Sequence, residues 1–245
     1  MVLNTGMPDD ALLQPLTDAP EKSALILDVD GTIAPIVARP ELAEIPEETR
    51  TELRRLAERY LLVACLSGRA GADARRLVGV PGIEVVGNHG LELAADAPSF
   101  ASRIAAFSAE VALPVEDKGL SLSYHYREAE DQAAARAELE GVAERAAAAG
   151  LVPRWGRKVL EIRPPVDADK GTAVRTLLTR AGATNGLYAG DDATDLDAFA
   201  GLRAAGLEHA VCVAVDSLEG PPGLREAADL VVLGAAGMAE LLRRL

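Results

Sequence analysis

Residues 24–32 read ALILDVDGT, an apolar run that ends in two aspartates, a glycine and a threonine. The run is long enough for one buried strand, with Asp28 at its carboxyl end. Asp30 follows two residues later, and Gly31 permits a sharp turn that lets both carboxylates face one pocket. Two neighbouring carboxylates suit a hard cation or an acid/base pair, although Asp-Gly-Thr is also common in ordinary turns.

The same pattern of an apolar run followed by polar or glycine residues recurs along the chain. Between the first two runs, residues 46–60 (PEETRTELRRLAERY) have a proline and acids at the start and apolar residues at helical spacing. Strands that alternate with helices indicate a parallel, Rossmann-like α/β sheet. The further strands are expected at residues 61–66, 186–189 and 210–215, which end at Ser67, Gly190 and Asp216.

The middle of the chain departs from this rhythm. Residues 120–127 (LSLSYHYR) alternate strictly between apolar and polar, which predicts a half-exposed strand of an antiparallel sheet. An alanine-rich helix is expected over residues 129–149, and a further strand over 158–163. The sequence therefore predicts an α/β core with an inserted α+β module, with residues 1–96 and 166–245 forming the core and residues 97–165 the module.

Reactive side chains follow several of the predicted core strands, where open α/β sheets bind ligands. The segment GDDATD (190–195) holds Asp191, Asp192 and Asp195. Several acids in one loop repel one another unless a cation neutralises them, although acids also favour an ordinary helix start. Ser67 stands at a strand end, and Lys170 at a helix start where a phosphate could bind, although a lone lysine is more typical of the surface.

Four of these segments together resemble the motifs of the haloacid dehalogenase superfamily of aspartate-nucleophile phosphatases. Three further segments narrow the resemblance to trehalose-6-phosphate phosphatases, and together the segments cover most of the chain. The superfamily motifs are DVDGT (28–32), LSGR (66–69), DKG (169–171) and GDDATD (190–195), and the narrower signatures are GNHGLEL (87–93), VEDKGLSLSYHYR (115–127) and GRKVLEIRPP (156–165).

The resemblance implies a role for each catalytic residue. Asp28 is expected to attack phosphorus and form an aspartyl-phosphate. Asp30 is expected to protonate the departing sugar oxygen and then to activate the water that hydrolyses the intermediate. Ser67 and Lys170 would hold the phosphoryl oxygens.

The resemblance also implies Mg²⁺ as the cofactor. The expected ligands are the Asp28 carboxylate, the Asp30 backbone carbonyl and Asp191. Asp192 and Asp195 are expected to position the metal and its waters.

The inserted module would be a cap that closes over the substrate. By resemblance, Glu116, Lys118 and Glu161 reach sugar hydroxyls, with cap-surface charges as the alternative. Arg69 would bind substrate or pair with a nearby acid, and His89 would bind substrate or be a structural hydrogen-bonder. His125 and Arg127 remain possible packing groups of the cap. The candidate substrate-binding residues are therefore Arg69, Asn88, His89, Glu116, Lys118, Arg157 and Glu161.

The composition excludes other classes of protein. There are 25 Lys and Arg against 38 Asp and Glu, a formal net charge of -13, whereas nucleic-acid binders are basic and anionic membranes repel acidic surfaces. No apolar stretch approaches the ~20 residues of a spanning helix, and the first ten residues lack a secretory pattern. We expect a cytoplasmic protein with buried, reduced Cys65 and Cys212, and without a nucleic-acid, membrane or obligate protein partner.

The resemblance implies hydrolysis of a small-molecule sugar phosphate, trehalose 6-phosphate. One alternative is a phosphatase of the same superfamily that acts on another sugar phosphate or on a glycosylated phosphoacid. Another is a non-catalytic regulatory protein that keeps the fold, which the intact acidic motifs oppose.

Overall fold

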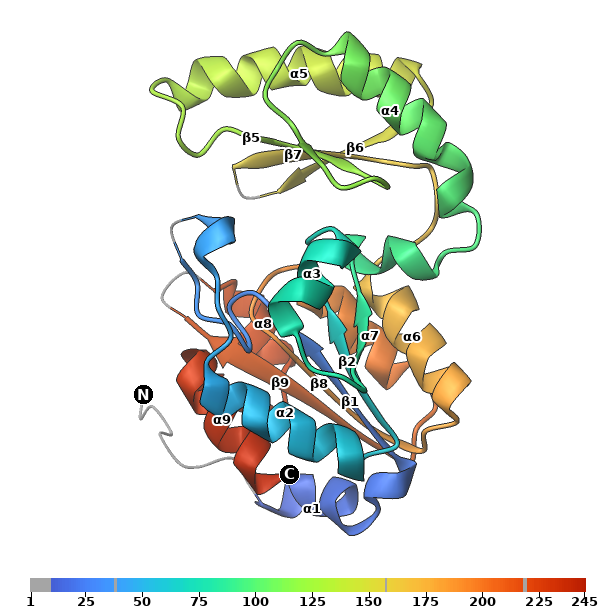
Figure 1. Cartoon of the computed structure of the whole chain (residues 1–245), viewed down its shortest axis with the longest axis vertical. Coiled ribbons are helices and arrows are strands. Elements are labelled where there is room, and N and C mark those ends of the chain that lie inside the picture. The colour runs from blue at the N-terminus through green and yellow to red at the C-terminus, as the bar shows by residue number, and fades with distance from the viewer. Residues whose placement is uncertain (1–9, 38, 157, 218–219) are drawn as a thin grey trace.

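The structure is a computed structural model that describes residues 10–37, 39–156, 158–217 and 220–245. It has two stacked parts, a larger lower one built on a parallel sheet and a smaller upper one built on an antiparallel sheet (Figure 1). Among the described residues, no helix has both the length and the hydropathy needed to cross a membrane. The predicted α/β architecture with an inserted α+β module is confirmed.

The lower part, the core, is organised around a six-stranded sheet in the order β10-β9-β8-β1-β2-β3. All neighbouring strands pair in parallel, and β1 lies between β2 and β8. Parallel pairing brings the carboxyl ends of these strands to one edge of the sheet. The strands are β1 (Ser23–Asp28), β2 (Leu62–Leu66), β3 (Glu84–Val86), β8 (Asn185–Gly190), β9 (His209–Asp216) and β10 (Leu230–Leu233).

Helices cover both faces of the core sheet, so its strands are almost wholly apolar. Leu53 and Leu56 of α2 (Glu47–Arg59) are buried, and so are Val174 and Leu177 of α6 (Lys170–Ala181). One face carries α1 (Asp10–Asp18), α2 (Glu47–Arg59), α3 (Gly71–Val78) and α9 (Gly234–Arg244). The other carries α6 (Lys170–Ala181), α7 (Asp195–Arg203) and α8 (Pro222–Ala227). The predicted buried, unpaired cysteines are confirmed at Cys65 and Cys212.

The upper part, called the inserted unit below, contains a four-stranded antiparallel sheet in the order β4-β5-β7-β6. Its two helices cover the face of this sheet that is turned away from the core (Figure 1). The other face therefore looks toward the carboxyl edge of the core sheet. The elements are α4 (Ala101–Glu110), β4 (Glu116–Asp117), β5 (Leu122–His125), α5 (Gln132–Ala148), β6 (Val152–Gly156) and β7 (Val159–Arg163).

The inserted unit also corrects three expectations from the sequence. The strand expected over residues 120–127 extends only over β5, and the helix expected from residue 129 begins at Gln132 because Asp131 caps it by accepting from two backbone N–H groups. The prediction of a half-exposed strand is wrong at Ser121 and Ser123, which are 0% and 2% exposed. Their polar face lies against the core rather than in solvent.

Short 3-10 segments complete the chain between these elements. The segment Asn88–Leu93 includes two non-glycine residues in left-handed conformation, Asn88 and His89, each with φ of 52°. Such a conformation is uncommon outside glycine and indicates a constrained backbone. The remaining 3-10 segments are Pro20–Lys22, Pro40–Leu42 and Ala97–Phe100.

Candidate active site

Asp28 ends the central strand β1 and is only 5% exposed. Burial raises the pKa of its carboxyl well above 3.8, and the neighbouring Lys170 opposes that rise. The Lys170 ammonium donates to Oδ1 of Asp28 and to Oδ1 of Asp195, each at 2.6 Å. Burial alone would lower the pKa of Lys170, but these two carboxylates outweigh it and hold the pKa above its ordinary value. Lys170 is therefore charged and held by hydrogen bonds between Asp28 and Asp195.

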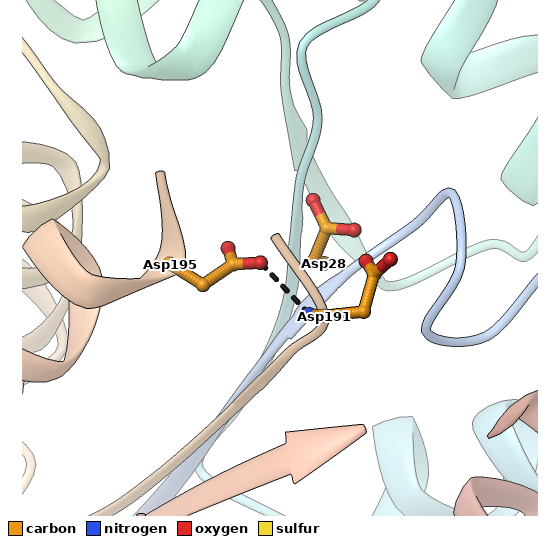
Figure 2. A group of neighbouring side chains, drawn as sticks. All are labelled: Asp28, Asp191 and Asp195. Atoms are coloured by element: carbon orange, nitrogen blue, oxygen red, sulfur yellow. Dashed lines mark hydrogen bonds between the residues drawn. The ribbon is translucent and has the colours of Figure 1, made fainter. Parts of the chain in front are cut away.

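Three buried carboxylates gather at this edge of the sheet: those of Asp28, Asp191 and Asp195 (Figure 2). One oxygen from each lies within 4.8 Å of the others. Burial, with the charge of Asp195 next, raises the pKa of Asp191 to about 7. Gly31 permits this approach, because a Cβ at Gly31 would lie 2.1 Å from Oδ2 of Asp191. A hard divalent cation fits the carboxylate oxygens of this cluster and would relieve the repulsion among them.

Asp195 has a different place in this cluster from Asp28 and Asp191. Its carboxylate accepts four hydrogen bonds: from Lys170 at 2.6 Å, from the Tyr188 hydroxyl at 2.7 Å, and from the backbone N–H groups of Asp191 and Asp192 at 2.9 and 2.8 Å. All of its acceptor capacity is thus used to hold the lysine and the loop (Figure 2 shows the bond to Asp191). Tyr188 belongs to this network, although its place in an apolar run gave no sign of a site residue.

Asp192 lies outside the buried cluster. It is exposed, and its carboxylate accepts from the backbone N–H of Ala193 at 2.7 Å. The sequence predicted that Asp192 and Asp195 together position the metal and its waters. In the structure Asp195 is buried in the cluster and Asp192 lies outside it.

Ser67 follows β2, whose last residue is paired with Asp28 at the end of β1. It is 1% exposed, and its Oγ accepts from the backbone N–H of Arg69 at 3.1 Å. The hydroxyl proton can therefore be donated to a ligand at the same edge of the sheet as Asp28.

Arg69 pairs with Asp30 through two parallel hydrogen bonds. Its Nε donates to Oδ2 at 2.7 Å and its terminal nitrogen to Oδ1 at 2.6 Å, and a further bond reaches the Pro40 carbonyl at 2.9 Å. The hydrogen bond to Asp30 is the main cause of the raised pKa of Arg69. Of the two interpretations left open by the sequence, the structure has Arg69 paired with an acid. The Asp30 carboxylate lies outside the buried cluster and is 43% exposed.

The inserted unit reaches the core through Lys118, whose ammonium donates to the Gly68 carbonyl at 2.9 Å. The Asn88 amide donates to the Lys118 carbonyl at 3.3 Å. The Ser121 hydroxyl lies 3.1 Å from Oδ1 of Asn88 and 3.0 Å from Oε1 of Glu161. Asn88, Lys118 and Glu161 thus belong to one hydrogen-bonded network between the two parts of the chain.

Glu116 lies beside this network on the same side of the inserted sheet. Oε2 of Glu116 is 2.8 Å from Nε2 of His125 and 3.9 Å from the ammonium of Lys118. The hydrogen bond with His125 is the main reason that the pKa of Glu116 is lowered. His125, one of the residues the sequence left as a packing group, therefore contacts a candidate sugar-binding carboxylate. Arg157 lies outside the described residues.

The His89 ring lies against the backbone of Gly68, where a Cβ would come within 2.5 Å of the ring. Nδ1 of His89 is buried and has no hydrogen-bond partner among the described residues. Burial, with the charge of Lys170 next, lowers the pKa of His89 well below 6.5. His89 is therefore a neutral ring packed against the loop that follows β2.

Comparison with known proteins supports the superfamily that the motifs suggested. A family model described as trehalose-phosphatase matches residues 26–103 and 113–223. The trehalose-phosphate phosphatase of Mycobacterium avium (strain 104) is 37% identical over 206 residues, which are 74% of this chain and 51% of that protein. An uncharacterized glycosyl hydrolase of Mycobacterium tuberculosis (strain H37Rv) is 36% identical over 210 residues, 76% of this chain and 16% of that protein.

The chain thus spans about half of the first of these relatives and a smaller part of the second. A solved structure of Aspergillus fumigatus trehalose-6-phosphate phosphatase is also similar, with a TM-score of 0.63 at 25% identity. That similarity covers 97% of this chain and 98% of the other, so it includes both the core and the inserted unit. Because the family model matches most of the sequence on both sides of a short gap, the chain belongs to the trehalose-phosphatase family.

Proposed function

We propose that the protein is a Mg²⁺-dependent phosphatase that hydrolyses trehalose 6-phosphate to trehalose and phosphate. The observation that carries the proposal is the buried group at the end of β1, where Lys170 bridges Asp28 and Asp195 beside Asp191. This group provides a carboxylate nucleophile, a fixed ammonium and a set of oxygen ligands at one point. This combination suits phosphoryl transfer, since most of the catalysis of that reaction is positioning and charge stabilisation.

In the proposed mechanism, an Asp28 oxygen attacks phosphorus and the bond from phosphorus to the sugar oxygen breaks. Asp30 gives its proton to the departing oxygen, which leaves as the free hydroxyl of the sugar. Water then attacks the aspartyl-phosphate, Asp30 accepts the proton of that water, and phosphate departs with Asp28 regenerated. Lys170 and Ser67 donate to the phosphoryl oxygens during both displacements.

The carboxylates of Asp28 and Asp191 and the backbone carbonyl of Asp30 would hold Mg²⁺. The ion would supply positive charge that lets a phosphate dianion approach the acidic cluster. Asp195 supports this site by fixing the backbone of Asp191 and the ammonium of Lys170.

Asp30 must turn during this cycle. Both oxygens of its carboxylate accept from Arg69 in the present structure, so the carboxylate is turned toward the guanidinium. We propose that substrate binding draws Arg69 toward the incoming phosphate and frees Asp30 to face the sugar oxygen. Arg69 would then contribute to substrate binding as well as to holding Asp30 before the reaction.

Residues 97–165 would act as a cap over this site. Glu116, Lys118 and Glu161 lie on its core-facing side and would hydrogen-bond sugar hydroxyls, while the cap keeps bulk water from the reacting atoms. Asn88 and His89 would contribute from the core, next to the loop that Lys118 contacts. We further propose that the enzyme works in the cytoplasm on this small-molecule substrate.

Phosphate release from a panel of mono- and disaccharide phosphates, with and without Mg²⁺, tests the proposal. We expect Mg²⁺-dependent release with a preference for trehalose 6-phosphate of about tenfold or more, or about 1.4 kcal/mol. Asp28→Asn should abolish release, whereas Asp18→Asn, an exposed aspartate on α1, should leave it unchanged. Activity that survives Asp28→Asn would refute the mechanism. Preference for another sugar phosphate would favour the alternative substrate, and Mg²⁺ binding without turnover would favour a regulatory protein.

A further inference from the structure

A row of four paired residues crosses the inserted sheet, and the face of this sheet that its helices leave uncovered is turned toward the core (Figure 1). Glu116 of β4 is paired with Ser123 of β5, Ser123 with Glu161 of β7, and Glu161 with Arg154 of β6. Directly paired residues of antiparallel strands point to the same face of a sheet. The row therefore includes one residue from each of the four strands, and it ends at Arg154.

One hydrogen-bonded link to the core and two electrostatic effects on core residues support the direction in which this row faces. Glu161 shares the Ser121 hydroxyl with Asn88 of the core. The positive charge of Arg154 contributes to lowering the pKa of His89 and opposes the rise in the pKa of Asp197. Both of these groups belong to the core, which agrees with the core-facing direction that the pairing with Glu161 gives to Arg154.

Arg154 differs from the other charged members of the row in its polar contacts. Glu116 is bonded to His125, and Glu161 is bonded to Ser121. Within the part of the chain that the structure describes, no hydrogen bond or salt bridge joins Arg154 to any group, although Glu161 lies directly opposite. A guanidinium has five N–H donors, so Arg154 presents unused donors to the space between the inserted unit and the core.

The length of the row bears on the size of the ligand. Neighbouring strands lie about 4.8 Å apart, so four strands span about 14 Å from β4 to β6. Lys118, beside Glu116, contacts the Gly68 carbonyl in the loop that would hold the phosphate. The phosphorylated ring would therefore lie toward β4, β5 and β7. Arg154, at the far edge, lies beyond the reach of a single ring held there.

We propose that Arg154 hydrogen-bonds the sugar ring that does not carry the phosphate, and so selects disaccharide phosphates over monosaccharide phosphates. This inference rests on the proposed function and names a specificity-determining residue for it. A monosaccharide phosphate leaves these donors in water, whereas a second ring offers them hydroxyl oxygens. Only the larger substrate gains from Arg154, and specificity is that difference in affinity.

The test compares Arg154→Gln with Arg145→Gln, an exposed arginine on α5, which packs on the opposite face of the inserted sheet. Steady-state kinetics are measured for each with trehalose 6-phosphate and with glucose 6-phosphate. We expect Arg154→Gln to raise KM for trehalose 6-phosphate about tenfold, which corresponds to about 1.4 kcal/mol, without changing kcat or either constant for glucose 6-phosphate. Arg154→Lys should recover part of the loss, and Arg145→Gln should match the wild type.

An unchanged KM for trehalose 6-phosphate in Arg154→Gln would overturn the inference. Equal losses of activity on both substrates would also overturn the inference, because they would assign Arg154 to cap closure. The same losses in Asp197→Asn would assign Arg154 to cap closure too and would overturn the inference in the same way. Titration calorimetry of trehalose 6-phosphate into Asp28→Asn, with and without Arg154→Gln, separates this inference from the proposed function. If the wild type releases no phosphate, the proposed function fails, while a Kd weakened by Arg154→Gln still supports the role of Arg154 and an unchanged Kd refutes it.

Discussion

The ammonium of Lys170 lies 2.6 Å from Oδ1 of Asp28, although the two residues are 142 positions apart in the chain. Lys170 reaches this point because it is the first residue of α6, which Asp169 caps with its side chain. Both partners are almost fully buried, at 2% and 5% exposure. The ammonium thus favours the ionised form of Asp28 and opposes the effect of burial on its pKa, and so little water reaches the pair that this interaction is weakly screened.

Lys170→Met should unfold more easily and should lose phosphate release. The variant leaves the carboxylates of Asp28 and Asp195 buried without a cation, which typically costs about 3–5 kcal/mol. Urea denaturation at neutral pH without Mg²⁺ measures the free energy of unfolding. Adding Asp195→Asn to this variant should restore part of the stability, because it removes one of the uncompensated charges. A Lys170→Met protein as stable as the wild type would show that the lysine does not balance the two acids.

Asp195→Asn should weaken Mg²⁺ binding much more than Asp192→Asn. Asp195 accepts four hydrogen bonds that fix the loop carrying Asp191, and loss of such supporting bonds typically costs about 10- to 100-fold in metal affinity. Asp192 is exposed and bonds only the next backbone N–H in the chain. Calorimetric titration with Mg²⁺ compares the two variants. Equal losses would mean that Asp192 takes part in the metal site when the ion is bound.

Asp30→Asn should slow the reaction in a way that depends on the leaving group. General acid catalysis typically raises the rate by about 10²–10⁴-fold. Nitrophenolate can leave without being protonated, whereas the oxygen of a sugar needs a proton to leave. With p-nitrophenyl phosphate, we expect a burst of one equivalent of nitrophenol before slow hydrolysis of the aspartyl-phosphate. With trehalose 6-phosphate, no burst of trehalose should appear. Rapid-quench measurements on both substrates check this, and a burst with both would exclude Asp30 as the acid.

His89 should make the protein less stable as the pH falls below about 6.5, the ordinary pKa of a histidine. Burial lowers its pKa in the folded state, so between the lowered pKa and 6.5 the unfolded chain binds more protons than the folded one. Under that condition the free energy of unfolding falls with falling pH. In His89→Asn, which tolerates the left-handed backbone at this position, the dependence should be shallower. Urea denaturation from pH 7.5 to 5 compares the two proteins, and identical slopes would contradict the prediction.

The sequence predicted the core and the location of its site because parallel strands place their carboxyl ends together. Asp28, Ser67 and Asp191 each follow an apolar run, so their meeting at one edge depends only on the sheet. Lys170 was predicted from its place at a helix start. These features depend on local patterns that a single sequence contains.

The features that the sequence did not reveal depend on where long side chains reach across the fold. Tyr188 lies within the apolar strand β8, and nothing in the pattern shows that its hydroxyl meets Asp195. The two-bond contact between Arg69 and Asp30 requires the direction of a guanidinium, which spacing does not give. In the inserted unit, β4 has only two exposed residues and β6 contains Pro153, so neither has the pattern of a strand.

The pairing of β1 with β8 has a consequence for the order in which the chain can fold. Ser23 and Asn185 are paired across 162 positions, so during synthesis the strand that carries Asp28 has one edge open until nearly the whole of β8 has left the ribosome. The inserted unit emerges entirely within that interval, and it has its own sheet and apolar core. The inserted unit can therefore fold first, which limits the conformations that the later segment of the chain must sample. A product that stops after β7 would expose the bare edge of β1, which makes such truncated chains targets for aggregation or degradation.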